Sequence, residues 1–154
     1  MTKRKSVIHE EIDRFGVSAG LKKKSGRWYR HCEDVIVVVD LQKSYWGNSY
    51  YVNMGFFLRA LGEKLFPLGR ECPISVRLES LGQDQQSRIE KILNLEYDIA
   101  DDQRLKELSD FLDSYLRPAL ERGCSMVGLR TMVDDGTLSN ARVTGEAETL
   151  LRTI

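Results

Sequence analysis

The residues with the clearest chemical potential are Lys and Arg side chains interleaved with aromatic rings between positions 22 and 46. Cations beside aromatic rings suit the acidic surface of a partner protein, or the phosphates and bases of single-stranded nucleic acid. One further polar position, Gln42, and one later arginine, Arg77, complete the set. The candidate binding residues are Lys22, Lys24, Arg27, Tyr29, Arg30, Gln42, Lys43, Trp46 and Arg77.

The tryptophans and the lysines of this region also have a purely structural interpretation. Trp28 and Trp46 are candidates for the core, because one face of each strand must be buried. The lysines at 22–24 are candidates for protection of an exposed sheet edge against pairing with other sheets.

A second cluster follows from the alternation in Ile74-Ser75-Val76-Arg77-Leu78-Glu79. Arg77 and Glu79 are predicted to point out of the same face of a strand. With Gln42 and Lys43 they would line a small polar groove where helices leave the sheet uncovered, or else they form ordinary cross-strand ion pairs.

The sequence gives little support to catalysis or metal binding. Ser44, His31 and Asp40 supply the residue types of a Ser-His-Asp triad, but no Gly-x-Ser-x-Gly turn presents the serine. His31 and Cys32 are neighbours on a predicted strand and therefore point to opposite faces, which disfavours a shared metal ion. We therefore predict no catalytic residue, no metal site and no cofactor.

The charges are unevenly distributed although the net charge of the 154 residues is zero. Residues 1–31 hold nine Lys or Arg against three Asp or Glu, and the remainder is correspondingly acidic. This asymmetry predicts a basic surface on an acidic body.

The first half of the chain changes from helical to extended patterns. Ile8, Ile12 and Phe15 recur at helical spacing and predict a helix over residues 6–19. Ser25-Gly26 predicts a hairpin turn, and strands follow over 27–32, 35–41, 49–58 and 74–79, the second of them central and buried.

The second half, residues 83–154, is predicted to be helical. The longest apolar stripe runs over 102–122, where Pro118 should kink or restart the helix at Arg117 and Gly123 should end it. A shorter helix is expected over 126–133, and the tail from residue 141 is a weak helix. The fold class is thus α+β: one domain over 1–154, with an antiparallel sheet of four to five strands in residues 20–80 and helices packed on one face.

Composition and cysteine usage limit the setting. The longest uninterrupted apolar run, residues 35–39, is far too short to span a bilayer, and acidic residues stand where a signal peptide needs an apolar segment. Three cysteines without a Cys-x-x-Cys pair disfavour a disulfide framework. These features predict a cytoplasmic protein without a membrane partner.

A family resemblance accompanies this pattern over residues 6–80. The residues that carry it are Gly20-Leu21-Lys22-Lys23-Lys24, Trp28-Tyr29-Arg30, Leu41-Gln42-Lys43-Ser44, Trp46-Gly47 and Tyr51-Val52-Asn53-Met54-Gly55. In these segments the chain resembles the domain-of-unknown-function 4304 family, whose members are mostly bacterial. The resemblance implies the fold and extent of the domain, and it assigns no activity and no site residue.

Two functions follow from these observations. The leading hypothesis is a non-catalytic binding protein with a protein partner, of which a toxin-blocking immunity protein is one form by analogy. The alternative is an enzyme or binder for nucleic acid or a small phosphorylated substrate, in which the basic edge holds the anion and Tyr29, His31 or Glu79 transfers protons. A deep pocket enclosing Arg77, Glu79 and Gln42 would favour this alternative, and a flat sheet face would disfavour it.

Overall fold

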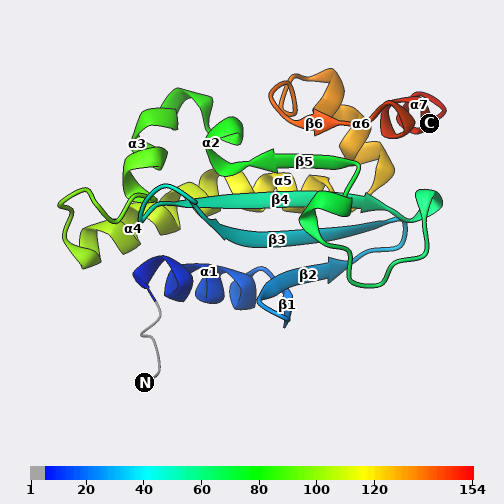
Figure 1. The fold of residues 1–154 in the computed structure, drawn as a ribbon. Coiled ribbons are helices and arrows are strands. Elements are labelled where there is room, and N and C mark those ends of the chain that lie inside the picture. Colours follow the sequence, from blue (N-terminus) through cyan, green and yellow to red (C-terminus); the bar gives the residue numbers. More distant parts are fainter. Residues whose placement is uncertain (1–5) are drawn as a thin grey trace.

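A single antiparallel sheet organises the fold, which a computed structural model describes for residues 6–154. Each strand pairs with the next along the chain, so the sheet order is the sequence order (Figure 1). The α+β class is confirmed. The six strands are β1 (Lys22–Lys24), β2 (Arg27–His31), β3 (Val35–Lys43), β4 (Tyr50–Leu58), β5 (Ile74–Arg77) and β6 (Arg142–Val143).

The strand count differs from the predicted four to five because of β6. This strand has only two residues, which pair with Ile74 and Ser75 of β5 far back in the chain. An alternation of apolar and polar residues cannot be recognised over two positions. The sheet therefore extends beyond residues 20–80 into the half predicted to be helical.

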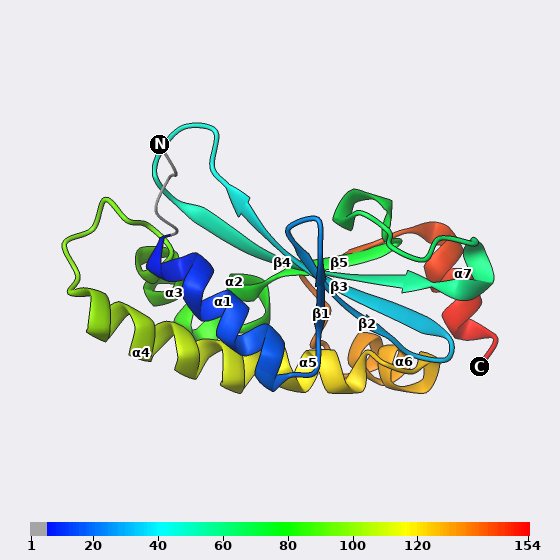
Figure 2. The ribbon, with the colours of Figure 1, turned by 90° about the horizontal axis from the view of Figure 1, so that it is seen from below.

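The helices lie on one side of the sheet. In Figure 2, α1, α4 and α5 form a layer along one face, and the opposite side carries the connections between strands. No α-helix in residues 6–154 is long and apolar enough to cross a membrane. The helices are α1 (Val7–Ser18), α2 (Leu78–Leu81), α3 (Gln86–Ile92), α4 (Asp101–Phe111), α5 (Arg117–Arg122), α6 (Met126–Asp134) and α7 (Gly145–Arg152).

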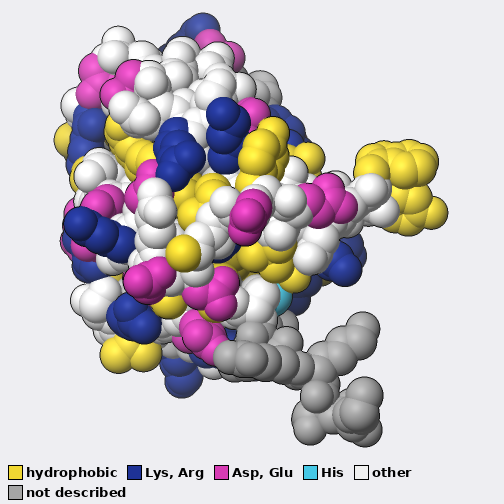
Figure 3. Space-filling model, turned by 90° about the vertical axis from the view of Figure 1, so that its left-hand side faces the viewer, with side chains coloured by type: hydrophobic (Ala, Val, Ile, Leu, Met, Phe, Trp, Pro, Cys, Tyr) yellow, Lys and Arg dark blue, Asp and Glu magenta, His cyan; other side chains and the backbone are white. Residues whose placement is uncertain are grey.

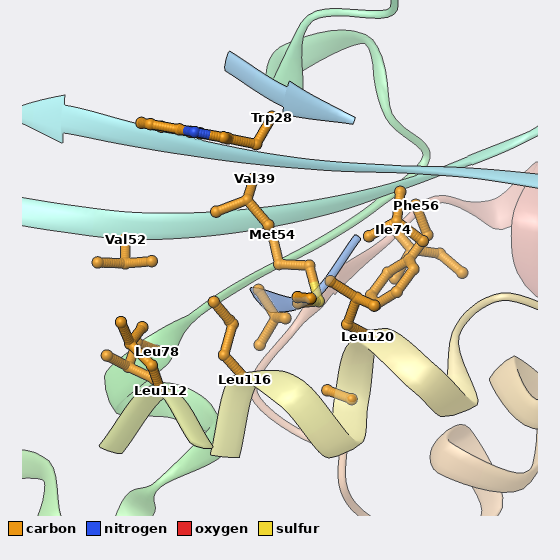
Figure 4. Packing of buried hydrophobic residues seen from close by; sticks show 14 of the residues in the cluster. Trp28, Val39, Val52, Met54, Phe56, Ile74, Leu78, Leu112, Leu116 and Leu120 are labelled. Atoms are coloured by element: carbon orange, nitrogen blue, oxygen red, sulfur yellow. The ribbon is translucent and has the colours of Figure 1, made fainter. Parts of the chain in front are cut away.

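Burial explains why β3 is central. All five residues of Val35–Val39 are buried, since helices cover one face and residues 59–72 cover part of the other. Figure 4 shows the main contact, where side chains of the sheet meet a leucine stripe from the helices. Each large apolar side chain removed from water stabilises the fold by about 1.5–3 kcal/mol. The labelled side chains in this contact are Trp28, Val39, Val52, Met54, Phe56, Ile74, Leu78, Leu112, Leu116 and Leu120.

Pro118 changes the helix geometry without breaking the helix. Residues Leu112–Leu116 form a π-helical turn between α4 and α5, and α5 begins at Arg117 as predicted. Proline lacks an N–H donor and its ring crowds the preceding turn, so a wider turn accommodates it. The helical layer can therefore continue along the sheet to Gly123.

The strand predicted over 74–79 is shorter in the structure. β5 ends at Arg77, and Leu78 and Glu79 belong to the short helix α2. Both residues are buried on the helical side of the molecule. Glu79 therefore does not share a strand face with Arg77, and that part of the predicted polar groove was wrong.

Candidate functional site

A row of polar side chains crosses the face of the sheet opposite the helices. Asp40 of β3 stands opposite Asn53 of β4, and Asn53 stands opposite Arg77 of β5. Arg27 of β2 extends the row. Trp28 pairs with Val39 of β3, so Arg27, the residue before Trp28, lies opposite Asp40. Side chains opposite one another in a sheet share a face, so these four lie on the same side.

Hydrogen bonds fix the middle of this row. Asn53 donates from Nδ2 to Oδ1 of Asp40 at 2.9 Å and to Oε1 of Gln42 at 3.0 Å. Both protons of the Asn53 amide are thus engaged, which sets its orientation. The network holds an acidic and two amide side chains on strands whose other residues are largely apolar.

The polar row forms the floor of an open hollow of about 880 Å³. Its walls come from the β1–β2 turn, the segment before β5 and the chain leading into β6. We call this feature the open-face hollow. It is lined by Ser25, Gly26, Arg27, Asp40, Leu41, Gln42, Asn53, Met54, Gly55, Leu68, Gly69, Arg70, Ser75, Val76, Arg77, Ser80, Asn140 and Arg142.

The open-face hollow is strongly cationic. Arg27, Arg70, Arg77 and Arg142 line it, against the single carboxylate of Asp40. Nine basic side chains on other surfaces form ion pairs with carboxylates. Within residues 6–154, none of the four arginines of the hollow has a carboxylate oxygen within 4.0 Å. Their charge is therefore available to an external anion.

Two of these arginines are held in place by uncharged groups. The Arg77 guanidinium lies 3.9 Å from the centre of the Tyr51 ring, a cation–π contact. Arg142 donates to the carbonyl oxygen of Cys72 at 2.7 Å and to Oγ of Ser75 at 3.3 Å. Arginine has five N–H donors, so donors remain for a ligand after these contacts.

The basic edge predicted from the sequence borders the hollow. Lys22 pairs with Tyr29 and Lys24 with Arg27, so these four side chains share the face opposite the helices. The Lys24 Nζ lies 3.7 Å from the centre of the Phe66 ring. β1 is also an edge strand, so its exposed lysines are suited to edge protection as well. The basic residues at positions 3–5 lie outside the described residues.

Tyr29 is buried beneath the wall of the hollow and does not line it. It is only 3% exposed and meets the Phe66 ring edge to face, with 5.2 Å between ring centres. Burial raises its pKa further above 10, so its hydroxyl stays protonated at neutral pH.

Arg30 lies on the opposite side of the sheet, facing the helices. It donates to Oε2 of Glu121 at 3.0 Å, to Sγ of Cys124 at 3.7 Å and to the carbonyl oxygen of Ala19. These bonds connect β2 to the end of α1 and to α5. Arg30 therefore has a structural role in this arrangement, away from the hollow.

Tyr45 and Trp46 form the second feature of this side of the molecule. They lie in the connection between β3 and β4, which reaches away from α4 and α5 in Figure 2. The two side chains are 89% and 90% exposed, and their rings meet edge to face at 5.0 Å. Figure 3 shows hydrophobic side chains standing clear of the surface on one side of the molecule. We call these two residues the aromatic pair.

The base of the aromatic pair is well anchored. Tyr50 donates its backbone N–H to Leu93, and Leu95 donates to Asn48, each at 2.9 Å. These bonds join the β3–β4 connection to the loop between α3 and α4. Arg104 holds that loop in place, because its almost completely buried side chain donates to backbone carbonyls of residues 91–97. An exposed aromatic pair on a fixed base loses little conformational freedom on binding.

The two tryptophans thus have opposite environments. Trp28 is 4% exposed and belongs to the core, as one of its two interpretations predicted, whereas Trp46 is outside the core. Lys43 is exposed at the end of β3, three residues before Trp46. Gln42, which lines the hollow, is only three residues from Tyr45, about 10 Å of extended chain.

The side chains considered for catalysis are not brought together. His31 pairs with Ile36 near the start of β3, and Ser44 follows the other end of that strand. Burial raises the pKa of Cys72 to about 12, and burial together with a hydrogen bond to Cys124 does the same for Cys32. In residues 6–154 no three His, Cys, Asp or Glu side chains are grouped as metal ligands.

Comparison with known proteins places the chain in a family. Residues 17–122 match the family described as Domain of unknown function (DUF4304). The chain belongs to the DUF4304 family. The DUF4304 match extends past the segments that suggested it, from β1 through α5, and leaves β6 with Arg142 outside. No curated protein and no solved structure matches the chain.

Sequence reasoning missed several residues of the open-face hollow. Asp40 and Asn53 had a usable signal, since both are polar within strands that are otherwise apolar. Arg70 lies in an irregular segment and Arg142 on the unrecognised strand β6, so no periodicity marked them.

Proposed function

We propose that this DUF4304 chain is a non-catalytic binding protein that engages a protein partner through the side of its sheet opposite the helices. The aromatic pair is the observation that carries this proposal. Large exposed aromatic side chains are unusual on a free surface, and Trp and Tyr dominate the energetic centres of protein interfaces.

The neighbouring hollow adds charge complementarity to this contact. Arg27 and Arg77 lie in it without carboxylate partners among the described residues. Gln42, which lines the hollow, lies on β3, the strand that leads to the aromatic pair. A partner with an apolar pocket beside an acidic surface would satisfy both features at once. A toxin held by its immunity protein is one such partner, by analogy alone. The expected setting is the bacterial cytoplasm, which suits three free cysteines.

The catalytic alternative has less support from the geometry. The open-face hollow contains Arg77 and Gln42, as a site for a small phosphorylated substrate would require, but Glu79 is buried in α2 outside it. Tyr29 is buried beneath the wall. Cations that bind an anion do not by themselves accelerate a reaction.

The test compares Trp46→Ser with Val17→Ser in partner capture from the native host. Val17 is a matched control because it is 81% exposed but lies on α1, on the helical side. The captured protein is then purified and titrated against each variant. We expect Trp46→Ser to weaken binding by roughly 2 kcal/mol, about thirtyfold, and Val17→Ser to leave it unchanged. Equal affinity of both variants and the wild type would refute the proposal.

A further inference from the structure

The arginines of the open-face hollow are spread over four separate segments. Arg27 is on β2, Arg70 in the turn before β5, Arg77 on β5 and Arg142 on β6. β2 and β5 are three strand spacings apart, about 14 Å. That distance exceeds the span of a single phosphate group. It matches two carboxylates four residues apart in an extended peptide, also about 14 Å.

The floor of the hollow favours a peptide over a nucleic acid. Asp40 places a carboxylate at the centre of the polar row, where a backbone N–H of a peptide can donate a hydrogen bond to it, whereas the sugar-phosphate backbone of a nucleic acid has no N–H donor. Of the described residues that line the hollow, none is aromatic, so it offers no ring for bases to stack on.

The fixed positions of two guanidinium groups favour a specific site over a diffuse basic surface. Arg77 rests on the Tyr51 ring, and Arg142 is bonded to Cys72 and Ser75. Because these side chains are already restricted, a ligand loses less binding free energy in ordering them. Arginine also pairs with carboxylates through two parallel N–H donors, which adds directional preference.

We infer that the open-face hollow binds an extended acidic peptide segment, with carboxylates reaching Arg27 and Arg77 from positions four residues apart. The inference rests on the proposed function, since it names the part of the partner that the hollow receives. The acidic segment crosses the strands over Asp40 and Asn53.

The experiment titrates a fluorescein-labelled peptide of alternating Asp and Ser into the full chain and follows fluorescence anisotropy at about 150 mM salt. A peptide with Asn in place of Asp and a labelled oligothymidylate are the comparison probes. We expect the Asp peptide to bind at least about tenfold more tightly than either comparison probe. Failure of the Asp peptide to bind, or equal or tighter binding of the oligothymidylate, would overturn the inference.

Variants separate the hollow from general charge. Arg27→Gln with Arg77→Gln should weaken the Asp peptide at least about tenfold. The matched control, Lys106→Gln with Arg152→Gln, removes the same charge at exposed positions outside the hollow and should change affinity less than about twofold. Arg70→Gln, at an exposed position on the other wall, gives a second variant and should weaken binding about threefold or more. Equal losses in the hollow variants and the control would contradict the inference.

This experiment fails separately from the test of the proposed function. Trp46→Ser should leave peptide affinity within about twofold, because Trp46 does not line the hollow. Loss of partner binding with intact peptide binding assigns the partner contact to the aromatic pair, as proposed. Intact partner binding in the Arg27 and Arg77 variant overturns the acidic-segment inference alone.

Discussion

Asn53 on β4 donates a hydrogen bond of 2.9 Å to Asp40 on β3, across the two longest strands of the sheet. A charged and an amide side chain therefore occupy the middle of a face where paired central strands usually carry apolar residues. Because these two side chains are polar, this part of the sheet buries less apolar surface, and the open-face hollow has a polar floor.

Asn53→Leu should lower the free energy of unfolding by about 1–3 kcal/mol, because the half-buried Asp40 carboxylate would lose its donor. Asp40→Leu combined with Asn53→Leu should be less destabilising than the sum of the two single changes, since replacing both partners leaves no unpaired polar group. Urea denaturation of the four proteins measures this coupling. Strictly additive losses would show that the hydrogen bond contributes nothing to stability.

Gly16→Ala should destabilise the protein, although alanine normally stabilises a helix interior by about 1 kcal/mol over glycine. A Cβ atom at Gly16 would lie 2.6 Å from Cδ1 of the buried Trp28 ring. The ring must shift within the core, at a cost of about 1–3 kcal/mol. Thermal unfolding measures the net change. Gly145→Ala is the control, because a Cβ atom at position 145 would meet open space. The melting temperature of this variant should not fall.

Glu79→Gln should stabilise the protein near neutral pH and flatten the dependence of stability on pH. Burial raises the pKa of Glu79 above 4.5, and its Oε2 has no hydrogen-bond partner among the described residues. Between pH 4.5 and the raised pKa, the folded state holds this proton while the unfolded chain has lost it. Stability therefore falls as pH rises through that interval, and at higher pH the folded state carries a buried, unpaired carboxylate.

A control variant and a second buried carboxyl group bear on this pH dependence. Glu63→Gln changes an exposed carboxylate and should leave the pH dependence as it is. Glu11 contributes a slope of the same sign, because burial raises its pKa against the opposing charge of Arg14. Denaturant unfolding of Glu79→Gln at pH 5 and pH 7 is the measurement. If the free energy of unfolding changed between pH 5 and pH 7 as much in Glu79→Gln as in the wild type, Glu79 would not be a source of the pH dependence.

The fold was largely predictable because its main elements have long, regular patterns. The Val35–Val39 run, the helical spacing of Ile8 and Ile12, and Pro118 each indicated the observed element. The exceptions are short. β6 has two residues and α2 has four, and neither length is enough for periodicity to distinguish strand from helix.

The candidate site was predictable only where its residues lie on strands that the sequence revealed. Arg27 was identified as a cation among aromatic residues and Arg77 from the alternation of its strand, with Gln42 as its predicted neighbour, whereas Arg70 and Arg142 reach the hollow through tertiary structure. The environment of a tryptophan was not predictable at all from residue type. Trp28 is covered because α1 packs over it, and Trp46 is exposed because its connection extends beyond the sheet.

The central claim is that the aromatic pair and the open-face hollow contact one partner together. Photo-crosslinking in the native host tests it most directly, with benzoylphenylalanine in place of Tyr45 and, as control, in place of Val17. We expect one cross-linked product from position 45, diminished at least about tenfold by Arg27→Gln with Arg77→Gln, and none from position 17. A product at position 45 that the arginine changes leave intact, or an equal product at position 17, would contradict the account.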